Sequence, residues 1–67
     1  MIISEDAKAI YKIYGIVLDD VDAVLVAHNC NTKAVASSKT AEEWAHTWAA
    51  AEKKTDELTY SEASRGY

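Results

Sequence analysis

The strongest structural signal in this chain of 67 residues is a helix start at Thr40-Ala41-Glu42-Glu43. A threonine at the N-cap accepts a hydrogen bond from the backbone N–H of Glu43, and the Glu43 carboxylate accepts one from the Thr40 N–H, so two otherwise unpaired donors are satisfied. Trp44 and Trp48, the two tryptophans of the chain, follow four positions apart and therefore share one face of the predicted helix. We expect this pair to be either core or contact surface, and we favour the core.

A first helix is predicted over residues 5–14. Ser4 is a residue type that caps helix N-termini, and the two acidic residues after it suit the positive end of the helix dipole. The apolar side chains recur at offsets of three and four, as on one face of a helix: Ile3, Ala7, Ile10, Tyr11 and Tyr14. Gly15 comes next, where a left-handed residue commonly ends a helix.

Two further helices and a short segment are predicted downstream. Asp19 is a good N-cap for a helix over 20–28. One face of that helix carries Val21, Val24, Leu25 and His28, and His28 suits its C-terminal end. A short segment is expected over 33–37. The helix that begins at Thr40 is expected to continue to 53–54, where two lysines suit the negative end of the dipole.

Strands in the N-terminal half are the competing interpretation. Residues 10–18 are mostly β-formers, and 24–26 and 34–36 have the composition of strands joined by a turn at 29–31. A strand over 10–18 would be apolar on both faces, and a chain this short has little material to cover both faces of a sheet. We therefore predict an all-α fold of three or four short helices in a small bundle. An α+β fold, with N-terminal strands packed on a C-terminal helix, stays open.

The size of the chain limits its core. We expect a single small helical domain over residues 1–58 and a flexible C-terminal tail over 59–67, because the last residues are polar and rich in serine. A chain of this length buries only about 60% of the surface that its unfolded form exposes. Burial and chain entropy then nearly cancel unless something adds further stabilisation. We therefore expect a homo-oligomer or a larger complex.

Charge and cysteine content limit the classes of partner and the cellular compartment that we expect. Eleven Asp and Glu residues against seven Lys and Arg give a formal net charge of −4, which argues against nucleic acid as a direct partner and favours a protein with a basic surface. The single cysteine, Cys30, cannot form an intramolecular disulfide. The sequence shows neither a secretory signal nor an apolar stretch long enough to span a membrane. We expect a cytoplasmic protein without membrane contact.

Motifs for catalysis and metal binding are weak. His28 and Cys30 resemble half of a metal site, but His46 would have to come from a distant helix, so we expect Cys30 to pack as a small apolar residue and His46 to face solvent. A Cys–His nucleophile pair needs both side chains aimed at one atom, which a spacing of two residues rarely gives. The sequence contains no glycine-rich phosphate loop and no hydrolase motif. We therefore expect no enzymatic activity, no cofactor and no bound metal.

Acidic and aromatic residues give the strongest indication of function. Acids at helix starts form a localised negative surface, although the same residues also cap helices and suit their dipoles. The candidate partner-binding residues are Asp19, Asp20, Asp22, Glu42, Glu43, Trp44 and Trp48. We predict a small acidic protein-binding protein: an inhibitor or accessory factor, such as one encoded by a phage or mobile element, that occludes the basic, nucleic-acid-binding surface of a host protein. The alternative is a self-assembling structural or assembly component built from helix packing.

Overall fold

Three α-helices account for most of the chain. The computed structural model describes the backbone of residues 2–64 and the side chains of residues 2–55. In chain order the helices are α1 (Ser4–Ile13), α2 (Asp20–Ala36) and α3 (Ala41–Ser64). The described residues contain no strand, so the all-α prediction is confirmed and the α+β alternative is wrong for this part of the chain.

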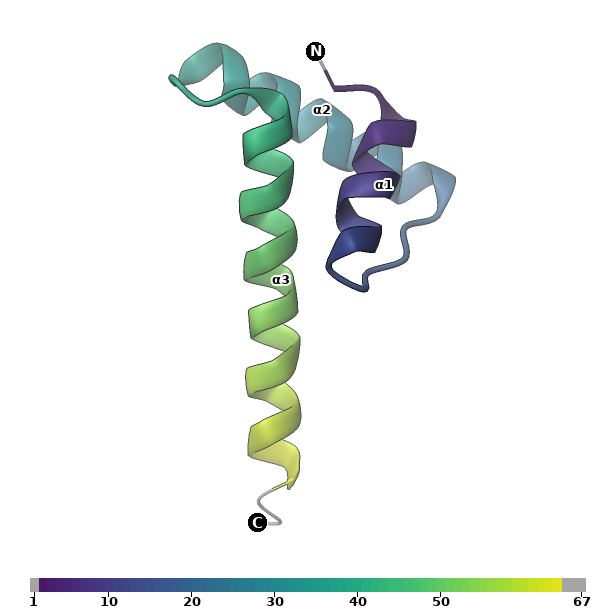
Figure 1. Cartoon of the computed structure of the whole chain (residues 1–67), viewed down its shortest axis with the longest axis vertical. Helices are drawn as coiled ribbons and strands as arrows, with labels where there is room; N and C mark the ends of the chain where they lie inside the picture. Colours follow the sequence, from purple (N-terminus) through teal and green to yellow (C-terminus); the bar gives the residue numbers. More distant parts are fainter. Residues whose placement is uncertain (1, 65–67) are drawn as a thin grey trace.

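The helices are arranged around α2. Every pair of helices is in contact, and α1 and α3 both lie on the near side of α2 in Figure 1. α3 is the longest, with 24 residues, and its C-terminal part extends well beyond the body that it forms with α1 and α2 (Figure 1). The side of α2 that faces away from α1 and α3 is therefore uncovered.

The first helix begins one residue earlier than predicted and lacks the predicted cap. Ile3 occupies the N-cap position with extended backbone and no capping side chain, so Ser4 is the first helical residue and the Ser4 cap was predicted wrongly. The end of α1 agrees with the prediction, because Gly15 has a positive φ of 79°. The Gly15 N–H donates to the Lys12 carbonyl (2.9 Å) and the Ile16 N–H to the Tyr11 carbonyl (3.1 Å). These two bonds form the Schellman motif that lets the chain leave α1.

The second helix is about twice as long as predicted. It continues past His28 to Ala36, and the segment predicted over 33–37 is its last part rather than a separate piece. Asn31, which we expected near a break, instead uses its side-chain amide on the backbone of Ile2: it accepts from the Ile2 N–H and donates to the Ile2 carbonyl, each at 3.0 Å. Both polar atoms of the Asn31 side chain therefore have hydrogen-bond partners while the helix continues through this residue.

The third helix starts as predicted. The Glu43 N–H donates to the Thr40 hydroxyl oxygen (3.1 Å), and the Thr40 N–H donates to the Glu43 carboxylate (3.2 Å), which is the expected capping box. The backbone of α3 continues through the predicted domain boundary at residue 58 as far as Ser64, while residues 65–67 of the predicted tail lie outside the described residues. The division at residue 58 stays a prediction.

Small side chains fill the space between the helices. The buried apolar residues are Ile2, Ala7, Ile10, Tyr11, Ala23, Ala27, Cys30, Ala41, Ala45 and Ala49. Most of them are alanines, so the helix backbones approach one another closely and each contact buries little area. Trp44 and Trp48 are only partly buried and pack against the edge of this core.

Candidate functional site

Four of the five valine and leucine side chains of α2 point to solvent, and the fifth, Val26, packs against the core. Val21 is 69% exposed, Val24 58%, Leu25 56% and Val35 88%, whereas the buried side of the helix carries Ala23, Ala27 and Cys30. We call the set Val21, Val24, Leu25, His28, Thr32 and Val35 the outward face of α2. A helix of a soluble protein normally turns its large apolar residues inward. The apolar face predicted from the sequence is therefore present, but α1 and α3 do not cover it.

An open hollow lies at the start of this face. Asp20, Val21, Val24 and Leu25 line a depression of about 340 Å³. Its walls are almost entirely apolar except for Asp20 at the rim. Contiguous exposed apolar surface with a polar rim is typical of a protein contact site.

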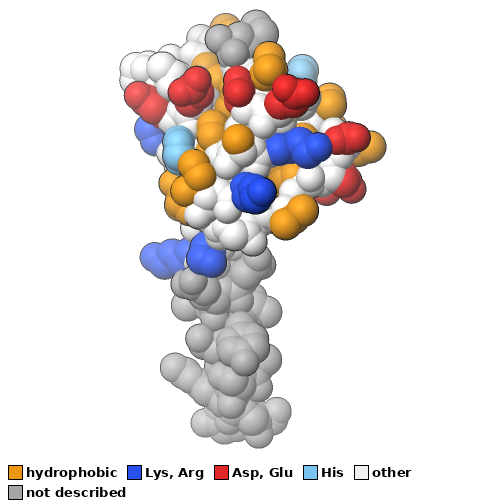
Figure 2. Space-filling view, turned by 45° about the vertical axis from the view of Figure 1, so that its right-hand side comes forward, with side chains coloured by type: hydrophobic (Ala, Val, Ile, Leu, Met, Phe, Trp, Pro, Cys, Tyr) orange, Lys and Arg blue, Asp and Glu red, His pale blue; other side chains and the backbone are white. Residues whose placement is uncertain are grey.

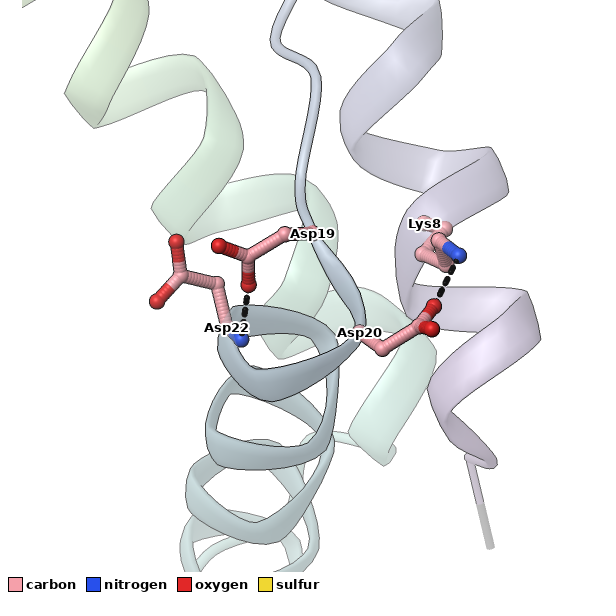
Figure 3. A network of polar contacts seen from close by, with 4 residues as sticks. All are labelled: Lys8, Asp19, Asp20 and Asp22. Carbon is pink, nitrogen blue, oxygen red and sulfur yellow. Dashed lines mark hydrogen bonds and ion pairs between the residues drawn. The ribbon is translucent and has the colours of Figure 1, made fainter.

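The aspartates at the start of α2 have three different roles. Asp19 is the N-cap, as predicted, because its carboxylate accepts a hydrogen bond from the Asp22 N–H (2.7 Å). Asp20 forms an ion pair with Lys8 of α1 (2.6 Å). The Asp22 carboxylate lies on the opposite side of the first turn from that pair (Figure 3) and makes no ion pair within the described residues.

The ion pair between Lys8 and Asp20 shifts both groups in the directions expected for opposite charges. The hydrogen bond and the positive charge of Lys8 lower the pKa of Asp20, and the same contacts raise the pKa of Lys8. Both side chains are exposed, so the pair contributes little to stability. The pair joins α1 to the first turn of α2 at the surface.

The predicted acidic residues do not form one cluster. The aspartates lie at the first turn of α2. Glu42 and Glu43 belong to the first turn of α3, which follows the last turn of α2 after a loop. α2 has 17 residues and is therefore roughly 25 Å long. Figure 2 shows acidic side chains spread along the upper part of one face, with apolar side chains between them and lysines mostly below.

Trp44 contacts the loop between α2 and α3, and Trp48 packs beside it. The two rings lie 5.7 Å apart, and the Trp44 indole N–H donates to the Ser37 hydroxyl (2.8 Å). The Lys39 ammonium lies 4.8 Å from the centre of the Trp44 ring. These contacts fix the loop against α3, so Trp44 is held in place from within the molecule.

The histidines and the cysteine are separated by the fold. Cys30 is buried between the helices, which raises the pKa of its thiol, and His28 lies on the exposed side of the same helix. His46 is hydrogen-bonded through Nδ1 to the Tyr14 hydroxyl (2.9 Å) and links the end of α1 to α3. Within the described part of the chain, no group of three or more His, Cys, Asp or Glu side chains is placed to hold a metal ion.

The chain matches no protein-family model, and it matches neither a curated protein nor a solved structure. No helix within the described residues is both long and apolar enough to cross a membrane. The geometry of the molecule itself is therefore the basis for its proposed function.

Sequence reasoning found the start of the outward face and missed its extent. Val21, Leu25, His28, Thr32 and Val35 follow one another at spacings of four, three, four and three residues. This regular stripe is visible in the sequence only when the helix is taken as continuous to Ala36. Ending the helix at His28 removed Thr32 and Val35 from the pattern.

Proposed function

We propose that this protein acts by binding another protein through the outward face of α2 and the aspartates at its start. The observation that carries this proposal is the inverted distribution of side chains on α2, with alanines and Cys30 inside and four of the five valine and leucine side chains outside. Removing apolar surface from water stabilises a complex by about 25 cal/mol per Å². The outward face of α2 stays in contact with water in the three-helix fold, so this stabilisation is not realised there. A partner that covers the face supplies it.

The charge beside this face favours a basic partner. The chain carries a formal net charge of −4. The Asp22 carboxylate, in the same first turn of α2 as Val21, makes no ion pair within the described residues. Complementary charges speed and orient association. We propose that the partner is a protein with a basic, nucleic-acid-binding surface and that this chain inhibits it by occluding that surface.

Substitution of the aspartates tests this role. In the triple variant Asp19→Asn, Asp20→Asn and Asp22→Asn, we expect association with the partner to slow about tenfold at low salt and to lose much of its salt dependence, because electrostatic steering is reduced. Asparagine still caps a helix, so α2 remains formed. The partner is first captured from a lysate with the intact chain, and association rates are then measured over a range of salt concentrations.

Glu42 provides a matched control for these aspartates. It is an exposed acid in the first turn of a helix, but it lies beyond the opposite end of α2. We expect Glu42→Gln to leave the association rate nearly unchanged. An association rate that is the same in the triple aspartate variant and in the unmodified chain contradicts the proposed role of the aspartates.

Self-assembly is a second candidate function, and the regular stripe on α2 favours it. The five positions of the stripe recur at an average spacing of 3.5 residues, as in helices that pair with helices, and three of them are aliphatic. Light scattering distinguishes the candidates: a mass that never exceeds that of a dimer supports an inhibitor or accessory factor, and particles that grow beyond a dimer with concentration support a structural assembly.

A further inference from the structure

The outward face of α2 has the pattern needed to pair with itself. We propose that it is covered by the same face of a second copy of this chain, with the two α2 helices antiparallel. This inference rests on the proposed function in taking the outward face as a contact surface. It departs from that proposal in one respect: a second copy covers the apolar stripe, and the basic partner is left with the aspartates at the start of α2.

The stripe runs the whole length of the helix. Its members, from Val21 to Val35, span most of the 17 residues of α2, and the 3.5-residue spacing keeps them on one side. Val21 and Val35 are each seven residues from His28, so the stripe has His28 at its middle. In an antiparallel pair, Val21 of each copy then lies opposite Val35 of the other, and the two His28 side chains meet at the two-fold axis.

The second copy reaches this face without displacing any helix. α1 and α3 both pack on the other side of α2 (Figure 1), and the aliphatic side chains of the stripe are already exposed. The helix backbones of two copies can therefore approach side by side. The interface is closed by its own symmetry, so pairing stops at the dimer.

Charge selects the antiparallel direction. The first turn of α2 carries Asp20 and Asp22, and the basic residue of its last part is Lys33. Asp22 and Lys33 lie on the same flank of the stripe, because they are 11 residues apart, close to three full turns. Antiparallel pairing brings Asp22 of each copy beside Lys33 of the other and opposes the two helix dipoles. Parallel pairing would align the two helix dipoles and bring the acidic first turns of both copies to the same end of the pair, which is repulsive.

Measurement of mass tests the dimer. We expect sedimentation equilibrium of the intact chain to give a concentration-dependent monomer–dimer equilibrium, and the double variant Val21→Gln and Leu25→Gln to weaken the dimer about tenfold or more. Both residues are exposed in the single chain, so the variant keeps the fold, which circular dichroism checks. The matched control is Ile13→Gln, which changes an aliphatic residue that is 72% exposed on α1 and should leave the dimer constant unchanged.

Cysteine cross-linking tests the register. Cys30 is buried, so the unmodified chain should not cross-link under mild oxidation. We expect His28→Cys to form a disulfide-linked dimer, and Val21→Cys to cross-link when mixed with Val35→Cys. Rapid cross-linking of Val21→Cys to itself would show parallel helices and overturn the antiparallel arrangement.

The two proposals fail in different ways. A chain that stays monomeric at all concentrations overturns the second-copy inference. Suppose that the chain is monomeric but captures a different protein from a lysate. If the double variant Val21→Gln and Leu25→Gln no longer captures that protein, the proposed function stands and that protein is the occupant of the outward face. If the double variant changes neither self-association nor capture, the outward face of α2 is not a contact surface and both proposals fall.

Discussion

At the scale of the single residue, Tyr11 is the largest side chain buried among the alanines. Its burial raises the pKa of the phenol to about 12, and the negative charge of Glu52 on α3 adds to this shift. The neutral form is therefore favoured in the folded state. The stabilisation from this group is complete below the unfolded pKa of about 10 and is lost as the pH rises through the folded value.

This shift predicts alkaline destabilisation that depends on Tyr11. The free energy of unfolding should fall between about pH 10 and 12, because the unfolded chain releases the phenol proton first. Urea unfolding at a series of pH values measures the fall, and tyrosinate absorbance follows the titration. Tyr11→Phe should show a smaller alkaline loss than the unmodified chain, and an equal loss in both would contradict the assignment.

At the scale of the element, the helix starts differ in how they are capped. α3 has a complete capping box, in which the Thr40 hydroxyl and the Glu43 carboxylate each accept a backbone N–H. α1 has no capping side chain, and Ser4 is already inside the helix. The two hydroxyl residues therefore look alike in the sequence but have different energetic roles.

Removing each hydroxyl separates these roles. We expect Thr40→Ala to lower the free energy of unfolding by about 1 kcal/mol, since it leaves the Glu43 N–H without its partner. Ser4→Ala should have only a small effect, because Ser4 makes no capping bond. Urea unfolding of the two variants gives the comparison. Equal losses would mean that the capping box on α3 contributes no special stability.

The predictability of each element follows from the range of its contacts. The caps at Asp19 and Thr40 and the turn at Gly15 were predicted correctly, because their bonds join residues three to five positions apart. The end of α2 was not, because the Asn31 amide is paired with Ile2, 29 positions away. No local pattern contains that information.

The candidate site was predictable in the same partial way. The sequence placed Asp19, Asp20 and Asp22 at a helix start and Val21, Val24 and Leu25 on one helical face. Which face of α2 is buried depends on how closely the alanines of three helices pack, and periodicity alone favours burying the larger residues. That the valine and leucine face of α2 is exposed could therefore be found only from the folded chain.

At the scale of the whole molecule, alanines set the distances between the helices. Ala45 of α3 is completely buried in the core with Ala27 and Cys30 of α2. A larger side chain at such a position has no free space, so neighbouring side chains must leave their preferred rotamers or the helices must separate.

Enlarging Ala45 should therefore be costly. We expect Ala45→Leu to lower the free energy of unfolding by about 1–3 kcal/mol, measured by urea or thermal unfolding. The control is Ala50→Leu, which introduces the same side chain at an exposed position of the same helix and should change stability little. A neutral Ala45→Leu variant would show that the helices are not held together by close packing of small residues.

The extension of α3 beyond the other helices affects how the size of this protein is judged in solution. The chain measures 44 × 25 × 17 Å, and its radius of gyration of 13.4 Å exceeds the roughly 11 Å of a compact domain of the same length. An elongated particle diffuses slowly and elutes early from a gel-filtration column calibrated with spherical standards. Gel filtration would then overestimate the molecular mass of a monomer, so the mass has to be measured by a method that does not depend on shape.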